Sequence, residues 1–439
     1  MQTPETETTL CLHSVEIPEA AISHHLSQYP HLEHLTLTEC HNLRVVFLKH
    51  PTISSLTIEN CSNLFMLDLK TPQLHTLRLS HLPKFSLNPV HLRARAASLK
   101  HFQVSDCPSM FSSSLMSQSV SLSSSFRADM KSKDRIETAD EAFSNIIASN
   151  LESLVIEEFD ALNHVKFPNI PITLKSLSVV GCMSFVGFKL TDAFPCTSVC
   201  LLDLSFSSIR DQSLPIVTKL FPNLYELLLI GCSELNRPLL ESDSLVRLDL
   251  SFSKVSGLKG YLPSLESLSI CDYVGSTSCF ESVLKNCPNI SYLDASFCSA
   301  TRLIIELPNL ESLILCGCKY LENVEILSVN TPFRLLDFSG SRSVCFVDCL
   351  LPLKNTHRLP LMVLATLPKK FSVLDYDITD INFSKPLTWN ELESKFPDVE
   401  FIWWGNGEPK QEAGAPSREV WSEGVYLESR GLEGISINL

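Results

Sequence analysis

The sequence predicts an α/β solenoid in which short parallel strands stack along one face. The chain has 439 residues, about three times the length of a typical single domain, so we expect several domains or one long repeat array. Its composition is biased, because 70 residues are leucine and 59 are serine. Such a bias indicates an internal repeat. A frame of constant spacing that recurs in separated segments supports the repeat directly.

The recurring frame is P-x-L-x-x-L-x-L-x-x-C-x-x-L, and it begins at Pro51, Pro222 and Pro308. It contains the leucine-rich-repeat pattern L-x-x-L-x-L-x-x-[NC], with cysteine in the last position. In L-x-L the alternate side chains of a short strand point inward, and one turn cannot bury its own apolar face. The sequence therefore predicts a leucine-rich-repeat horseshoe with a long parallel sheet on its concave face.

Residues 1–404 are predicted to form about sixteen turns of this solenoid. We take the second apolar position of the frame as the anchor of each turn. The predicted anchors are Val15, Leu35, Leu56, Leu77, Phe102, Leu154, Leu177, Leu202, Leu227, Leu248, Leu268, Leu293, Leu313, Leu336, Leu374 and Ile402.

Two kinds of return path are expected on the convex face. Longer turns carry helix-like segments, with apolar residues three and four apart, at Glu19–Tyr29, Asp211–Phe221 and Thr277–Asn286. Turns of about 20 residues are too short for a helix and carry a second apolar triplet, which predicts a short strand or extended segment. These triplets are Leu64, Leu67 and Leu69; Val255, Leu258 and Gly260; and Leu321, Val324 and Ile326.

Two segments depart from the frame. Ser109–Ser125 contains ten serines in seventeen residues, so residues 109–136 are predicted to be a mobile insertion, open to phosphorylation as a second interpretation. Residues 405–439 lose the frame and are predicted to be a flexible tail. Before that tail, we expect a last short helix at Trp389–Phe396 and a last strand at Val399–Trp404.

Charge and segment composition exclude several functions. The net charge of −14 repels phosphate backbones, so we expect no nucleic-acid partner. We find neither a secretory signal nor eighteen consecutive apolar residues, so we expect no membrane partner and a cytoplasmic or nuclear location. The sixteen cysteines are then expected to be reduced thiols.

Seven cysteines form a ladder, because each lies five residues after an anchor: Cys40, Cys61, Cys107, Cys182, Cys232, Cys298 and Cys318. This periodicity predicts small buried groups whose thiols face backbone polar groups. No nucleophile, zinc-protease, phosphate-loop or dinucleotide motif accompanies them. We therefore expect no enzyme activity, no catalytic residues, no cofactor and no metal site.

Four aspartates are the most informative polar residues. Asp203, Asp249, Asp294 and Asp337 each follow an anchor in every second turn, so they are predicted to form one row on the concave face, about 9.6 Å apart. Ser205, Ser251, Ser296 and Ser339 lie two residues further on, and Arg247 and Tyr292 flank the row. One interpretation is a solvated face whose Asp and Ser caps satisfy local donors. The other is a partner-binding acidic stripe that docks a basic segment.

The frame, with cysteine in the ladder position, resembles the cysteine-containing repeats of plant-type F-box/leucine-rich-repeat proteins of the ribonuclease-inhibitor-like superfamily. The resemblance implies protein–protein recognition through the concave face, as the substrate-recognition array of an SCF-type ubiquitin ligase complex. No three-helix F-box is recognisable, so we expect a Skp1-type adaptor only if an F-box lies outside this chain. The alternatives are a non-ligase adaptor or scaffold and the sensing region of an immune-type receptor.

Overall fold

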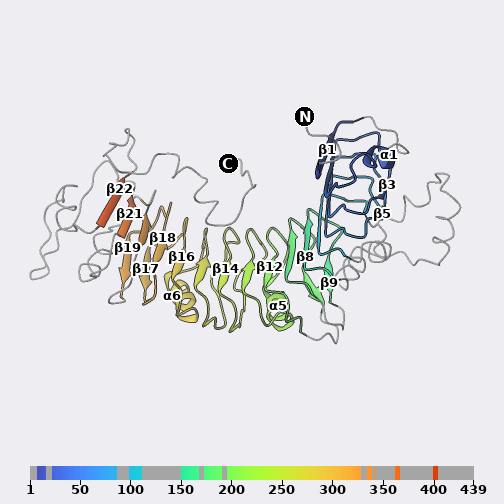
Figure 1. Cartoon of the computed structure of the whole chain (residues 1–439). Coiled ribbons are helices and arrows are strands. Elements are labelled where there is room, and N and C mark those ends of the chain that lie inside the picture. The colour runs from blue at the N-terminus through green and yellow to red at the C-terminus, as the bar shows by residue number, and fades with distance from the viewer. Residues whose placement is uncertain are drawn as a thin grey trace, which may run out of the picture.

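The computed structural model describes residues 7–15, 22–86, 98–110, 150–167, 173–189, 195–327, 334–338 and 341, together with the strands at 361–365 and 399–403. These residues form a leucine-rich-repeat solenoid, as the frame predicts. Figure 1 shows the turns stacked into one curved array, with the large sheet running along its whole length. The Ser-rich insertion beyond Met110, the predicted helix at Trp389–Phe396 and the predicted tail at 405–439 lie outside the described residues.

The large sheet has sixteen strands, all parallel to their neighbours. In spatial order they are β1 (Thr9–His13), β2 (His34–Thr38), β4 (Ser55–Glu59), β6 (Thr76–Ser80), β7 (His101–Ser105), β8 (Ser153–Glu157), β10 (Ser176–Val180), β12 (Leu201–Asp203), β13 (Glu226–Leu228), β14 (Arg247–Asp249), β15 (Ser267–Ser269), β16 (Tyr292–Asp294), β18 (Ser312–Ile314), β20 (Leu335–Phe338), β21 (Leu361–Ala365) and β22 (Val399–Trp403).

The core is a stack of anchor side chains. Leu35, Leu56 and Leu77 are paired in register on successive strands. These anchors, and the apolar residue two positions after each, are buried. Alternate side chains of a strand point to opposite faces, so the residues next to the anchors are left for the concave face. Each turn thus adds two apolar side chains to a single continuous core.

The first predicted anchor is wrong. The strand of the first turn is β1, in which Leu10, not Val15, pairs with Leu35. The segment contains two overlapping alternations, Leu10 with Leu12 and Val15 with Ile17, and both fit a period of two. Pairing with the next turn selects the first alternation, because Leu12 then joins the core.

The last two anchors also shift. The predicted anchor Leu374 lies outside the described residues, and the strand of its turn is β21, where Val363 pairs with Leu336. The final strand β22 lies where the sequence predicts it, but Phe401 pairs with Val363, one residue before the predicted anchor Ile402. A wide spacing before these turns leaves several alternations compatible with the sequence, so the register depends on the neighbouring strand.

The return paths follow the predicted division between helices and extended segments. The helices α1 (Ile22–Leu26), α5 (Leu214–Leu220, after a 3₁₀ turn at Asp211–Ser213) and α6 (Thr277–Asn286) fall within the three predicted helical segments. Three two-stranded parallel sheets form from β3 (Val45–Lys49) and β5 (Met66–Lys70), β9 (His164–Lys166) and β11 (Gly187–Lys189), and β17 (Arg302–Ile305) and β19 (Asn323–Ile326). The triplet at Val255 is reduced to one bridge, between Leu239 and Lys259.

Candidate functional site

The four aspartates occupy one row across the central strands, as their spacing predicts. In the sheet register, the residues that follow the anchors pair from strand to strand in the order Asp203, Leu228, Asp249, Ser269, Asp294, Ile314, Asp337. Carboxylates therefore lie on every second strand, about 9.6 Å apart for a strand spacing of about 4.8 Å. We call this row the carboxylate row.

The carboxylates are less exposed than the sequence predicts. Asp203 is half-buried, Asp249 and Asp337 are 9% and 6% exposed, and Asp294 is fully buried. The solvated part of the first interpretation is therefore wrong for Asp249, Asp294 and Asp337. The apolar side chains of Leu228 and Ile314 lie between the carboxylates in the register, and a single-turn pattern does not reveal that packing.

The carboxylates also cap their own strands. Oδ1 of Asp203, Asp249 and Asp294 accepts a hydrogen bond from the backbone N–H two residues later, at 3.0, 2.9 and 3.0 Å. The hydroxyl of Ser296 adds a second donor to Asp294 at 2.7 Å. The local-cap interpretation is thus confirmed for these three turns.

Charge accumulates at the start of the row. Burial, together with the nearby charges of Asp249 and Glu157, raises the pKa of Asp203 above its usual value, against the lowering effect of its hydrogen bonds with Ser205. Glu157 lies at the end of β8 and is half-buried. A cation placed over these carboxylates would relieve their mutual repulsion.

The flanking residues Arg247 and Tyr292 each lie one position before an anchor, next to the carboxylate row and not within it. In the sheet register they lie on either side of Ser267. Arg247 is exposed, and its guanidinium carbon lies 6.0 Å from the ring centroid of Tyr225. Tyr292 is half-buried. The predicted site residues are therefore brought together over β12 to β20, but Arg247 is the most exposed of them.

The serines that follow the caps differ in their bonding. Ser205 Oγ accepts from the backbone N–H of Ile230 at 3.3 Å, and Ser296 donates to Asp294. Ser251 is fully buried, and within the described part of the chain its Oγ finds no hydrogen-bond partner. A buried hydroxyl without a partner is costly, so Ser251 is the least satisfied of these serines.

The cysteine ladder lies behind the concave strands and is buried at all seven positions. Six of its thiols donate to the carbonyl two residues past the anchor of the preceding turn, for example Cys232 to Leu204 at 3.2 Å and Cys318 to Ala295 at 3.4 Å. Burial raises the pKa of Cys61 and Cys232 to about 11 and of Cys107 and Cys182 to about 12. These thiols are structural groups, because the thiolate is the reactive form.

Serine shares the ladder position, which the sequence pattern missed. Ser253 Oγ donates to the Leu229 carbonyl at 2.6 Å and accepts from the Cys232 N–H at 2.8 Å. Ser341 makes the same pair of bonds with Leu315 and Cys318, at 2.5 and 2.8 Å. The signal was present in the repeated segment Leu-Asp-Leu-Ser-Phe-Ser, whose last serine occupies this position.

A second column was also missed, at the position just before the ladder. In thirteen successive turns this residue has a positive φ between 43° and 66°, the left-handed region. Its members are Ser14, Glu39, Asn60, His81, Asp106, Glu158, Gly181, Phe206, Gly231, Phe252, Asp272, Phe297 and Gly317. A bulky side chain there costs about 1 to 2 kcal/mol relative to glycine. The three phenylalanines are therefore the least expected residues of the column.

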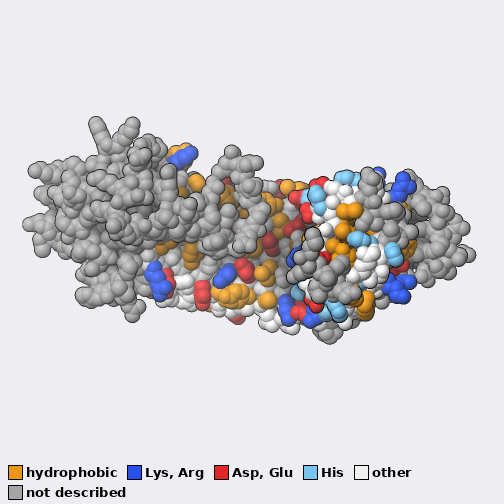
Figure 2. Space-filling view, turned by 45° about the horizontal axis from the view of Figure 1, so that its top comes forward, with side chains coloured by type: hydrophobic (Ala, Val, Ile, Leu, Met, Phe, Trp, Pro, Cys, Tyr) orange, Lys and Arg blue, Asp and Glu red, His pale blue; other side chains and the backbone are white. Residues whose placement is uncertain are grey.

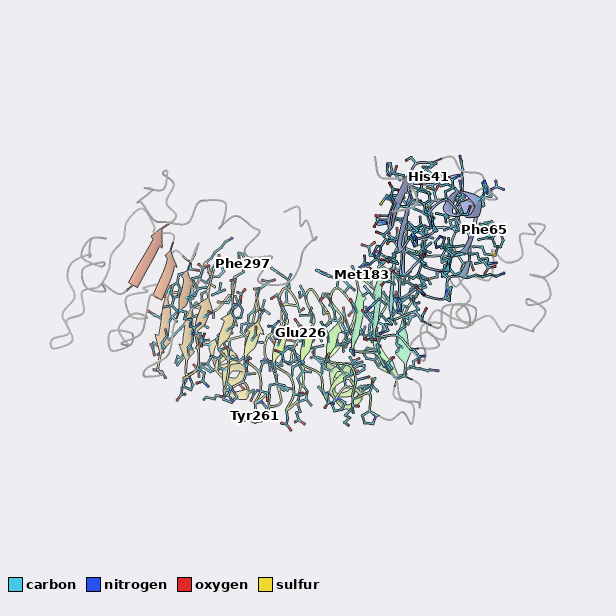
Figure 3. All side chains as sticks on the ribbon, viewed as in Figure 1. His41, Phe65, Met183, Glu226, Tyr261 and Phe297 are labelled. Atoms are coloured by element: carbon cyan, nitrogen blue, oxygen red, sulfur yellow. The ribbon has the colours of Figure 1, made fainter. Side chains whose placement is uncertain are left out.

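The three phenylalanines form an edge along the ends of the central strands, which we call the aromatic rim. Phe252 and Phe297 are 46% and 52% exposed, and Phe206 is half-buried. Figure 3 shows Phe297 and Met183 along the upper edge of the array and Tyr261 along the lower edge. In the space-filling view, hydrophobic and acidic side chains lie next to one another over the middle of the array (Figure 2).

Among the described residues, no group of three or more His, Cys, Asp or Glu side chains is arranged to hold a metal ion. Likewise, none of the helices in the described ranges is long and apolar enough to cross a membrane.

A family model supports the leucine-rich repeat in the first part of the chain. The family model described as "At1g61320/AtMIF1, LRR domain" matches residues 3–132. No curated protein matches the chain. The solved structure of YopM from Yersinia enterocolitica WA-314 is 17% identical and has a TM-score of 0.39, covering 83% of this chain and 80% of YopM.

Two further structures are similar to this chain. The yeast complex of Rad7 and Elc1 matches at 13% identity and a TM-score of 0.29, with 88% of each chain covered. An internalin, inlF, from Listeria monocytogenes matches at 14% identity and a TM-score of 0.27, covering 74% of this chain and 88% of the internalin.

Proposed function

We propose that this protein binds a protein partner through the concave face of its repeat array, over the carboxylate row. The observation that carries the proposal is the register, which sets Asp203, Asp249, Asp294 and Asp337 on every second strand of one sheet. The frame residues are occupied in building the core, so recognition falls to the side chains between them. A long row of like charge favours a partner segment that carries Lys or Arg.

The expected contribution of the row is moderate. Charge pairs at partly exposed sites give about 0.2 to 1 kcal/mol each, so two of them change the affinity by up to about thirtyfold. Steering by the row acts mainly on the association rate and weakens with salt. A partner held by this row therefore binds more slowly once the charges are removed.

The test is capture of partners by the full chain and by two matched double variants. Asp203→Asn with Asp249→Asn removes two charges from the row but keeps Oδ1 as the acceptor for Ser205 and Ser251 N–H. Glu241→Gln with Asp243→Asn removes two exposed charges outside the sheet. We expect the first pair to lose the captured partner, with a slower association rate and a shallower salt dependence, and the second pair to retain it. Equal capture by both pairs would contradict the proposal.

We further propose, as the more specific form, that the captured partner is a substrate of an SCF-type ubiquitin ligase. The support is the resemblance of the cysteine-containing frame to F-box/leucine-rich-repeat arrays. The test is the lifetime of the captured partner in cells with and without this protein. A longer lifetime in its absence, reversed by the wild type but not by the Asp203→Asn, Asp249→Asn variant, supports the ligase. An unchanged lifetime favours the alternative, an adaptor or scaffold.

A further inference from the structure

The aromatic rim has no structural need for phenylalanine. At the same position of other turns the chain uses Gly, Asn, Asp, Ser, Glu or His, and all of them adopt the same left-handed conformation without an aromatic hydrocarbon ring. Phe252 and Phe297 instead keep about half of their surface exposed. Exposed aromatic side chains in a strained backbone position indicate a binding role, because neither burial nor local geometry favours them there.

The rings are held in place by the following turn. A Cβ on Gly231 would lie 2.6 Å from Cδ1 of Phe206, and one on Gly317 would lie 2.5 Å from Cε1 of Phe297. One edge of Phe206 and one edge of Phe297 thus rest on a glycine backbone. These two rings are therefore fixed parts of the rim.

The rim shares its spacing with the carboxylate row. Phe206, Phe252 and Phe297 follow β12, β14 and β16, so they lie on every second turn, about 9.6 Å apart. Each comes three residues after a carboxylate of the row: Asp203, Asp249 or Asp294. Two parallel tracks therefore share one repeat: an exposed aromatic track, and beside it an acidic track that is most exposed at Asp203.

A polyproline II helix has this repeat. It turns once every three residues and rises about 3.1 Å per residue, so one of its edges repeats every 9.3 Å, approximately. In a fully extended strand, side chains on one face repeat about every 6.7 Å, so they do not match the spacing of the two tracks beyond one repeat. Because the backbone of a polyproline II segment makes no internal hydrogen bonds, its carbonyls can accept from a protein donor.

We propose that the two tracks bind a polyproline II segment of the partner protein, with an apolar residue on each phenylalanine and a Lys or Arg near each carboxylate, in triplet repeat. This inference rests on the proposed function and specifies the chemistry of the partner. Charge complementarity selects the basic residue, and the exposed rings select the apolar one.

The test uses the full chain and a fluorescent peptide of repeated Leu-Pro-Lys triplets, with a peptide of the same composition in shuffled order as control. We expect the triplet peptide to bind at least about tenfold more tightly than the shuffled one by anisotropy. The variant Phe252→Asn, Phe297→Asn should lose about tenfold or more, since two anchor side chains are removed. Asparagine already occupies this position at Asn60, so the variant should melt no lower than the wild type.

Tyr261→Asn is the matched control, because Tyr261 is 53% exposed on the opposite edge, and it should leave peptide affinity unchanged. Absence of binding, or equal binding of the two peptides, would overturn the inference. So would an unchanged affinity in a folded rim variant. If the partner captured by the array is lost from the Asp203→Asn, Asp249→Asn variant but retained by the rim variant, the proposed function stands and this inference fails.

Discussion

Replacing Ser253 with alanine should destabilise the array more than replacing its neighbour Cys232. Both side chains are fully buried in the ladder position of adjacent turns. Ser253 Oγ joins the Leu229 carbonyl to the Cys232 N–H, and its loss leaves a buried acceptor and a buried donor unpaired. Each such group costs about 1 to 2 kcal/mol, so Ser253→Ala should lower the free energy of unfolding by about 2 to 4 kcal/mol. Cys232→Ala removes one weak thiol donor and a small apolar group, for about 1 to 2 kcal/mol.

Ser253→Cys is the matched control, because cysteine fills the same position in seven other turns and in six of them donates to the equivalent carbonyl. We expect it to recover part of the loss seen with Ser253→Ala. Urea unfolding gives the free energies, and hydrogen exchange should show faster exchange at the Cys232 amide in Ser253→Ala only. If Ser253→Ala is no less stable than Cys232→Ala, the paired bonds of the serine do not stabilise the ladder as described.

Three further outcomes follow from the same geometry. Gly231→Ala should destabilise the array by about 1 to 3 kcal/mol, because the φ of Gly231 is +65° and the added Cβ would meet the ring of Phe206. Adding Phe206→Ala should recover the steric part of this loss. Additive losses in a double-mutant cycle would show that the ring and the glycine do not interact. The free energy of unfolding should fall as the pH rises from 9 toward 11, because folding holds the pKa of Cys61 and Cys232 near 11, above the 9.0 of a free thiol, and the unfolded chain loses these protons first. In the same pH range a thiol reagent should label the exposed Cys11 and Cys200 before the ladder cysteines. Equal labelling of all these cysteines would contradict the buried position of the ladder. Affinity for a basic peptide should rise as the pH rises above 3.8, because the bound cation favours the ionised form of Asp203, whose pKa is raised in the free protein. If an Asp203→Asn variant keeps the same pH dependence, a group other than Asp203 causes it.

The repeat frame is strong enough to predict the fold. The repeat spacing alone predicts the positions of most strands and the burial of the seven ladder cysteines. It also predicts α6, and the predicted bounds of that helix are the observed ones. The register errors at Val15, Leu374 and Ile402 fall where two alternations are both possible, and only pairing with a neighbouring strand chooses between them.

The candidate site was predictable in position but not in environment. The period of two turns gave the row of Asp203 to Asp337, whereas the burial of Asp294 depends on neighbours such as Ile314 that belong to another turn. The left-handed backbone at Phe206, Phe252 and Phe297 was also out of reach. A propensity scale assigns that conformation to Gly or Asn, whereas the solenoid imposes it on thirteen successive turns regardless of the residue.

Hydroxyl-radical footprinting of the array with its captured partner tests the central claim most directly. Tyr225, which lies under the guanidinium of the concave-face residue Arg247, and Phe252, on the aromatic rim, are 45% and 46% exposed. Tyr261, on the opposite edge, is 53% exposed, so the rates of oxidation of the three side chains in the free protein are comparable. The partner should protect Tyr225 and Phe252 and leave Tyr261 unchanged. Protection of Tyr261 with undiminished oxidation of Tyr225 and Phe252 would show that recognition does not use the concave face.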